Sequence, residues 1–177
     1  MILAIYALVL ATMIGSFLNV LIYRLPRDID FVWKRSHCPE CKHKVSWYDN
    51  IPVFSFVILK AKCRHCLKKI SFKYPLVEIL TGFAGFYFYW QYDSIFLSTI
   101  YFLMTCAFIV HFFIDLEFQI LPDVVNIFLL ILFLIWTFYF SKYEHAIWGF
   151  GVGLGIPFLI AFTYEKLAGR EGLGMGD

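Results

Sequence analysis

Long apolar runs separated by short polar segments dominate the sequence. In chain order, they cover residues 2–23, 76–90, 95–114, 124–140 and 146–164. A helix needs about 20 apolar residues to cross roughly 30 Å of hydrocarbon, so each run is predicted to be a transmembrane helix. The second run is short and lies at the lower edge of spanning length. The pattern therefore predicts an all-α polytopic membrane protein with about five transmembrane helices.

Composition supports the same class. Hydrophobic residues make up 61% of the chain, aromatic residues 21% and charged residues 16%. An ordinary soluble domain carries about 25% charged residues, so the composition excludes one. The lipid bilayer is the first expected partner, and no nucleic-acid partner is expected.

Positive charge is concentrated between the first two apolar runs. Residues 24–75 hold 12 of the 15 Lys and Arg residues against four acidic residues, which gives this loop a net charge of +8. Loops rich in Lys and Arg face the cytoplasm, so this loop is predicted to be cytoplasmic. Threading the remaining helices from there places the connection 115–123 and the segment 165–177 on the cytoplasmic side as well.

The basic loop contains two C-x2-C motifs, Cys38 to Cys41 and Cys63 to Cys66, separated by 21 residues. Two such motifs place four thiolates around one ion, and four sulfur ligands leave no open position, which is typical of a structural zinc site. A pair of disulfides is the alternative, which a reducing cytoplasm disfavours. The loop is therefore predicted to be a small zinc-knuckle domain, whereas Cys106, inside an apolar run, is expected to be a packed hydrophobic side chain.

Two aspartates lie where apolar segments meet polar ones. Asp115 closes the run 95–114, and Asp177 ends the sequence Gly174-Met175-Gly176-Asp177. Carboxylates at membrane depth are costly and are usually kept for a function, and the predicted topology places both on one side. One ionised and one protonated carboxylate can hydrolyse a peptide, so the pair is a candidate membrane aspartyl protease dyad. Asp123, better explained as a helix N-cap or first-turn acid, is a rival for the first position.

Other polar or small residues near these runs have simpler expected roles. Glu117 is expected to be a solvated surface charge, and His111, one turn before Asp115, to serve packing or local tuning. Glu78 is expected either to interact with a helix dipole or to contact a basic peptide. Four glycines are expected to form a close-packing surface on the last helix: Gly149, Gly151, Gly153 and Gly155.

Several ordered motifs resemble those of the type IV prepilin peptidases. They are Gly15-Ser16-Phe17-Leu18-Asn19-Val20 with Tyr23-Arg24-Leu25-Pro26, the cysteine motifs around Asn50-Ile51-Pro52, Tyr74-Pro75-Leu76-Val77-Glu78, Ile114-Asp115 with Leu121-Pro122-Asp123, and Glu171-Gly172-Leu173-Gly174-Met175-Gly176-Asp177. The resemblance covers essentially the whole chain in the family's order. It implies a multi-pass enzyme of the bacterial cytoplasmic (inner) membrane.

The resemblance also implies chemistry and partners. Members of this family are aspartyl endopeptidases that remove the basic leader of type IV prepilins and pseudopilins at the cytoplasmic face. Their catalytic pair falls on Asp115 and Asp177. Many also methylate the new N-terminus with S-adenosylmethionine. The expected organisation is a first transmembrane helix (1–23), a cytoplasmic basic four-cysteine zinc domain (24–75) and a membrane-embedded peptidase core (76–177).

One departure from the family pattern concerns the end of the chain. Family members continue past the G-x-G-D motif through about three more helices, so the resemblance implies a core that is incomplete at its C-terminus and is expected to be inactive alone. Two other classes of function stay open from the residues. One is a non-enzymatic membrane adaptor that docks a partner through the zinc loop, and the other is a methyltransferase without peptidase activity.

Overall fold

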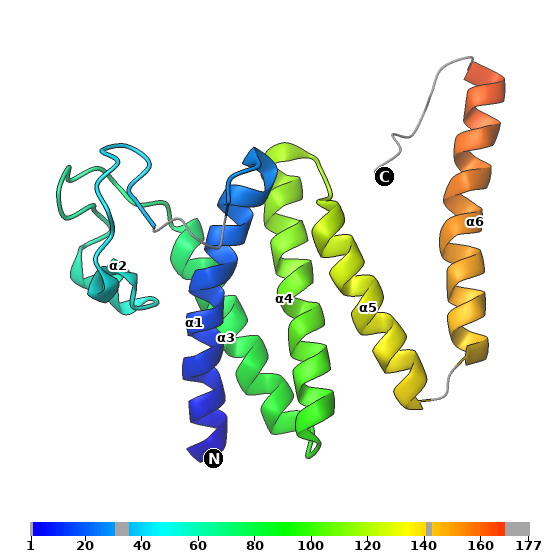
Figure 1. The fold of residues 1–177 in the computed structure, drawn as a ribbon, viewed down its shortest axis with the longest axis horizontal. Coiled ribbons are helices and arrows are strands. Elements are labelled where there is room, and N and C mark those ends of the chain that lie inside the picture. The colour runs from blue at the N-terminus through cyan, green and yellow to red at the C-terminus, as the bar shows by residue number, and fades with distance from the viewer. Residues whose placement is uncertain (1, 31–35, 141–142, 169–177) are drawn as a thin grey trace. The chain divides into compact units, whose positions relative to one another are not determined.

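The structure, a computed structural model, describes residues 2–30, 36–140 and 143–168. These residues form six α-helices and two 3-10 helices, with no β-strand among them (Figure 1). The α-helices are α1 (Ile2–Arg24), α2 (Phe54–Ile58), α3 (Lys73–Gln91), α4 (Ile95–Phe118), α5 (Asp123–Phe140) and α6 (Tyr143–Ala168), and the 3-10 helices are η1 (Leu25–Arg27) and η2 (Trp47–Asn50). The five long helices coincide with the five predicted apolar runs, which confirms the predicted all-α class.

Four of the described helices are long and apolar enough to cross a membrane. They are α1 with its η1 extension, α4, α5 and α6, and the chain is therefore a multi-pass membrane protein. The exception among the long helices is α3, which was predicted to be the shortest span. Its 19 residues include buried Glu78 and Thr81, and these polar side chains face neighbouring helices.

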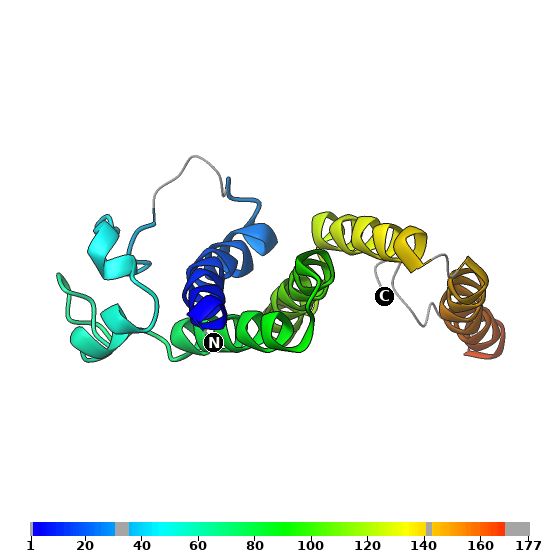
Figure 2. The ribbon, with the colours of Figure 1, turned by 90° about the horizontal axis from the view of Figure 1, so that it is seen from below.

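The chain divides into two compact units, residues 1–125 and 126–177. In the first unit, α1, α3 and α4 pack against one another, and α1 and α3 share the most extensive contact (Figures 1 and 2). The core of this unit is apolar, and Ile22 and Ile114 are fully buried. The second unit contains most of α5 and all of α6.

Small residues bring α1 and α3 close together. A Cβ atom added to Gly15 would lie 2.8 Å from Glu78 Cα, and a Cβ on Gly82 or Gly85 would overlap the side chain of Thr12 or of Ala11. Glycine is therefore required where the two backbones approach, as it is at many membrane helix interfaces. The close-packing glycines of the described structure thus lie on α1 and α3.

The glycines of α6 have a different environment. A Cβ added at Gly149, Gly151, Gly153 or Gly155 would meet no atom of another element within 4 Å. The close-packing role expected for them stays a prediction.

This difference between glycines gives a matched test of helix packing. Gly15→Ala should destabilise the first unit by about 1–3 kcal/mol, because the new methyl group meets the α3 backbone and cannot be relieved by a rotamer change. Gly151→Ala should be neutral or stabilising by up to about 1 kcal/mol, because alanine is the better helix former. Thermal unfolding in detergent measures both, and equal midpoints for the two variants would contradict the close approach.

The C-terminal end of α4 lies further along the chain than the apolar run predicts. The run ends at Ile114, but the helix continues to Phe118, where Gln119 adopts a left-handed conformation (φ 53°) and donates its N–H to Asp115 O at 2.9 Å. Asp115 and Glu117 therefore lie in the last helical turn, beyond the end of the apolar run. Backbone hydrogen bonding, which hydropathy does not report, sets this end of the helix.

Candidate functional site: the cysteine loop and the adjoining helix ends

The first cysteine motif is a tight turn closed by its own backbone. Cys38 N–H donates to His43 O at 2.9 Å, and Lys42 N–H donates to Cys38 O at 3.0 Å. Lys42, directly after Cys41, has a φ of 59°, which reverses the chain direction. The turn places both thiols of this motif on one side.

The second motif repeats this geometry. Cys63 N–H donates to Lys68 O at 2.8 Å, Leu67 N–H donates to Cys63 O at 3.0 Å, and Leu67 has a φ of 57°. Each motif also carries one isolated antiparallel bridge across its base. Two copies of one turn therefore face each other across a common centre.

All four thiols of the loop meet at that centre. Their Sγ atoms lie within 4.8 Å of one another, in the cluster Cys38, Cys41, Cys63 and Cys66. Cys38 Sγ and Cys66 Sγ are 3.9 Å apart, close to the edge of about 3.8 Å of a tetrahedron with Zn–S bonds of about 2.3 Å. All five cysteines of the chain are free thiols, so the disulfide alternative is not the arrangement found. The cluster can hold a metal ion.

Backbone N–H groups stabilise the thiolate form of cysteines in this cluster. The N–H groups of Cys66 and His65 point at the Cys63 sulfur and lower the pKa of that thiol to about 7. Around Cys66, the N–H of Lys68 favours the thiolate, but burial and the other three thiols outweigh it and raise the pKa to about 11. Without a metal, Cys63 is thus the thiol that most readily loses its proton. Binding of a metal cation by all four sulfurs requires the other thiols to release their protons as well.

Two ion pairs connect the second motif to η2 and to the first motif. Arg64 donates to both carboxylate oxygens of Asp49, with Nη2 to Oδ1 at 2.6 Å and Nε to Oδ2 at 3.0 Å, and this lowers the pKa of Asp49. Lys68 and Glu40 form a second, exposed pair at 3.1 Å. The Arg64–Asp49 pair is bidentate and its Asp49 side chain is largely shielded from solvent. It therefore holds η2 to the second motif more firmly than the exposed Lys68–Glu40 pair holds the first motif to the second.

Two buried side chains make hydrogen bonds where the loop meets α1 and α3. Glu78 of α3 accepts a hydrogen bond from Val53 N–H at 2.8 Å and another from the Ser16 hydroxyl. Asn19 of α1 donates to Tyr74 O at 3.0 Å. Both Glu78 and Asn19 are more than 90% buried. The Glu78 carboxylate is thus engaged in a structural contact, a role that the sequence did not reveal.

This contact predicts a graded effect of substitution. Glu78→Ala leaves the part-buried Val53 N–H without its acceptor, which should destabilise the attachment of the loop by about 1–3 kcal/mol. Glu78→Gln keeps one acceptor oxygen and should cost clearly less. Hydrogen exchange of the Val53 amide measures this, and exchange that is unchanged in both variants would show that the contact does not hold the loop.

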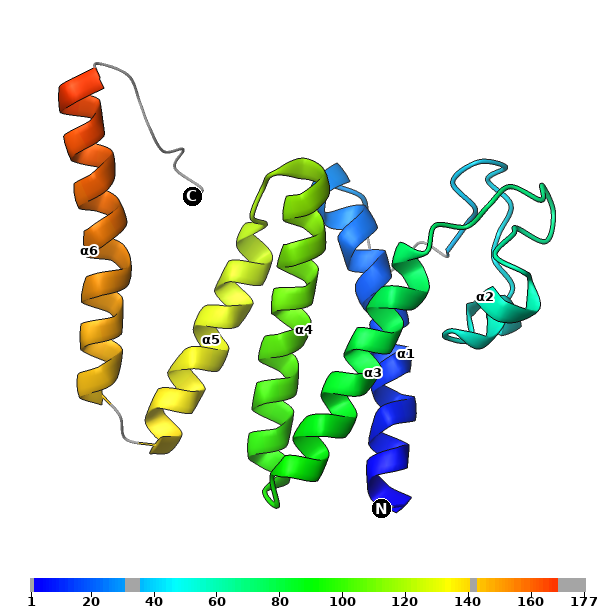
Figure 3. The same cartoon turned by 180° about the vertical axis from the view of Figure 1, so that it is seen from behind.

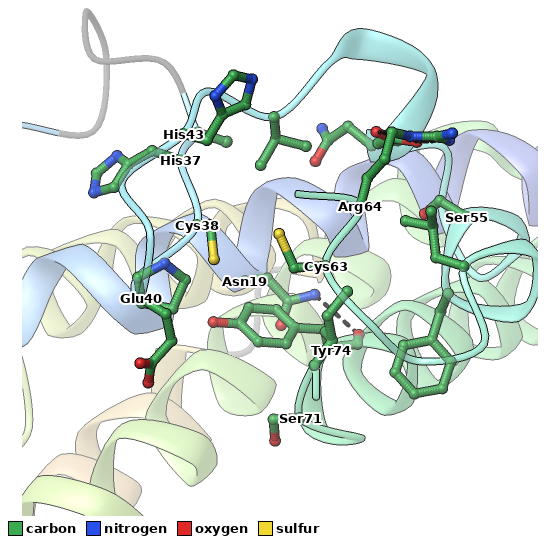
Figure 4. Close-up of a pocket in the computed structure, with 18 of the residues that line it drawn as sticks. Asn19, His37, Cys38, Glu40, His43, Ser55, Cys63, Arg64, Ser71 and Tyr74 are labelled. Carbon is green, nitrogen blue, oxygen red and sulfur yellow. Dashed lines mark hydrogen bonds and ion pairs between the residues drawn. The ribbon is translucent and has the colours of Figure 1, made fainter. Parts of the chain in front are cut away.

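A cavity of about 370 Å³ lies between the cysteine loop and these helices (Figure 4). Its lining includes Cys38 and Cys63 from the loop and Asn19, Tyr74 and Glu78 from α1 and α3. The Oδ1 atom of Asn19 is buried and accepts no hydrogen bond from the described residues. Neither Asp115 nor Asp123 lines this cavity.

The last turn of α4 lies beside the base of the cysteine loop. Lys73 Nζ at the start of α3 contacts Glu117 Oε1 at 2.5 Å, and the guanidinium of Arg27 lies 4.8 Å from the centre of the Phe118 ring. Glu117 is exposed, in agreement with its prediction as a solvated charge, and it also forms this ion pair. The contacts fix the helix end that carries Asp115.

The predicted carboxylates are only partly placed by the structure. Asp115 is exposed in the last turn of α4, whereas Asp177 lies outside the described residues. Asp123 is the first residue of α5 and is exposed, as expected for a first-turn acid. His111, one turn before Asp115, is buried.

Two family models match consecutive parts of the chain. The bacterial peptidase A24 N-terminal domain matches residues 9–92, and the type IV leader peptidase family matches residues 101–177. A prepilin leader peptidase/N-methyltransferase of Stutzerimonas stutzeri is 33% identical over 97% of this chain and 68% of that protein. The chain belongs to the prepilin leader peptidase family. No solved structure matches it.

Further members of the prepilin leader peptidase family show the same relationship. The protein of that name from Myxococcus xanthus is 38% identical over 98% of this chain and 52% of its own length, and the one from Neisseria gonorrhoeae is 32% identical over 97% and 69%. The chain thus spans between about half and about two thirds of the relatives it matches. The first matched segment contains the four clustered cysteines and Glu78, and the second contains Asp115 and Asp177.

Proposed function

We propose that the whole protein is a membrane aspartyl endopeptidase that removes the basic leader of type IV prepilins or pseudopilins. Membership of the prepilin leader peptidase family is the observation that carries this proposal. The multi-pass character of the chain supports it, because the scissile bond must be reached at the membrane surface.

The proposed catalytic pair is Asp115 and Asp177. One ionised carboxylate takes a proton from water as the water attacks the peptide carbonyl, and the protonated partner delivers a proton to the leaving nitrogen. Exposure of Asp115 at a helix end fixed by the Lys73–Glu117 ion pair supports its role, because a substrate can approach a carboxylate that is held in place. Asp123 keeps the role of a first-turn acid in α5.

The four clustered cysteines are proposed to hold one zinc ion. Their spacing and the sulfur separation near that of a tetrahedral site support zinc over an open catalytic metal. A four-thiolate shell leaves no position for water or substrate, so the ion would brace the two turns of the loop and take no part in hydrolysis.

The proposed location is the bacterial cytoplasmic (inner) membrane, with the cysteine loop and both aspartates on the cytoplasmic side. The net charge of +8 on residues 24–75 supports this orientation. The zinc-bearing domain (24–75) and the peptidase core (76–177) would then meet at the helix ends where Lys73 contacts Glu117.

We also propose methyl transfer to the newly exposed N-terminus, with S-adenosylmethionine as the methyl donor. The relatives carry N-methyltransferase in their names, and this supports the second activity. The peptidase and methyltransferase proposals are separable, since only cleavage needs the aspartate pair.

Reconstitution of the whole protein with a type IV prepilin tests the proposal. Mass spectrometry of the pilin N-terminus should show loss of the leader and, with S-adenosylmethionine present, one added methyl group. A non-enzymatic adaptor would bind the precursor and leave its mass unchanged. A methyltransferase without peptidase activity would modify only a pilin that had already lost its leader.

A further inference from the structure

The short helix α2 exposes an unusually apolar face. Phe54, Val57 and Ile58 are 70%, 68% and 71% exposed, and Ile51 just before the helix is also exposed. These four residues, here called the α2 face, form a compact patch on one helical turn and its approach. A loop with a net charge of +8 would not be expected to leave such a patch in water.

The opposite side of α2 faces inward and is fixed. Ser55, Phe56 and Leu59 line the cavity below the cysteine cluster. The ring of Phe56 lies 6.1 Å from that of Phe72 in an edge-to-face arrangement. The orientation of α2 is therefore determined by packing, and the exposure of the α2 face is a consequence of that orientation.

The attachment to Glu78 also sets the depth of α2. Val53, the N-cap residue, is hydrogen-bonded to Glu78, which lies five residues into α3 and so about 7.5 Å along the helix axis from its first residue. Glu78 also contacts Ser16, eight residues and about 12 Å before the end of α1 at Arg24. Figures 1 and 3 accordingly show α2 beside α1 and α3 and below the level at which α3 begins.

The backbone of this turn is suited to an apolar environment. The N–H groups of Ser55, Val57 and Leu59 donate to carbonyl oxygens of the same turn at 2.9–3.2 Å, and Val53 N–H donates to Glu78. The Ser55 hydroxyl donates to Ile51 O at 2.8 Å. Internal pairing of this kind is required of any backbone that enters lipid.

We propose that α2 is an interfacial anchor whose exposed apolar face is immersed in the lipid leaflet on the side of the cysteine loop. The attachment to Glu78 lies about 7.5 Å along α3 from its first residue, within the 5–10 Å to which interfacial helices enter the boundary between headgroups and acyl chains. Lys60 and Lys62 follow the helix directly and are exposed, in position to meet anionic headgroups. The anchor holds the cysteine loop against the membrane at a second point besides the covalent connections to α1 and α3.

Site-specific photo-crosslinking in bilayers tests this proposal. The photoreactive side chain benzoylphenylalanine is placed at Phe54, Ile58 or Leu67 of the full-length protein, reconstituted in vesicles of phosphatidylethanolamine and phosphatidylglycerol. Leu67 is the matched control, because it is apolar and 69% exposed but lies at the tip of the second cysteine motif. Adducts are identified by mass spectrometry after irradiation.

Positions 54 and 58 should form phospholipid adducts at a yield about fivefold or more above position 67. Equal yields of phospholipid adduct at all three positions would overturn the proposal. Adducts with a second copy of the chain, or with an added prepilin in place of lipid, would likewise overturn it by identifying a protein partner for the α2 face.

Discussion

Asp115→Asn and Asp177→Asn, made in the whole protein, should each abolish leader removal from a type IV prepilin. An asparagine amide can neither accept the proton of the attacking water nor share a proton with its partner. The expected loss is about three orders of magnitude or more in the rate of cleavage, within the range that acid–base groups contribute. Membrane insertion should be unaffected, because each substitution exchanges a carboxylate for a neutral amide of nearly the same size.

Asp123→Asn is the matched control for this experiment. Asp123 is the first residue of α5, and asparagine at a helix start is about as favourable as aspartate, so cleavage should change little. If Asp123→Asn stops cleavage and Asp115→Asn does not, Asp115 has been assigned the wrong role. If none of the three substitutions matters, the aspartyl mechanism itself is wrong.

Purified protein should contain about one zinc ion per chain, and Cys38→Ser or Cys63→Ser should weaken its binding by more than about 100-fold. Loss of a residue that hydrogen-bonds to a metal ligand already lowers metal affinity about 10–100-fold, and loss of a ligand itself lowers it more. Because the free energy of metal binding also stabilises the fold around a structural site, the cysteine loop should become sensitive to protease in these variants. Metal analysis and limited proteolysis measure the two effects.

Cys106→Ala supplies the control for the zinc measurement. Cys106 is buried within α4 and lies outside the cysteine cluster, so its removal should leave the zinc content unchanged. Full retention of zinc in a Cys38→Ser, Cys63→Ser double variant would exclude the proposed site. A chelator should impair folding of the loop or docking of substrate more than the hydrolytic step.

The second motif shows why the four-cysteine site could be predicted from the sequence. A two-residue spacer between cysteines constrains the chain to one kind of tight turn, and the turns at Cys38 and Cys63 have nearly the same hydrogen bonds. The left-handed conformations of Lys42 and Leu67 carried no such signal, because neither residue is glycine or asparagine. Spacing therefore predicted the ligands but not the backbone that positions them.

The role of Glu78 shows where sequence reasoning reached its limit. Glutamate near the start of an apolar helix is compatible with dipole stabilisation, with substrate binding and with a structural tether. Its contacts with Val53 and Ser16 join segments that are 25 and 62 residues away along the chain. No local pattern contains such long-range pairings.

The sequence by itself determined the class of protein, the five long helices, the four clustered cysteines and the family. Each of these depends on composition, on apolar run length or on the local spacing of residues, which the linear order of side chains contains directly. The tertiary structure alone decided that α1 and α3 approach each other at Gly15, that α4 continues through Asp115, and that α2 turns an apolar face outward beside the membrane helices. These features depend on which helices come into contact and on which polar groups are hydrogen-bonded between them. Such contacts form only when segments that are distant in the sequence pack together.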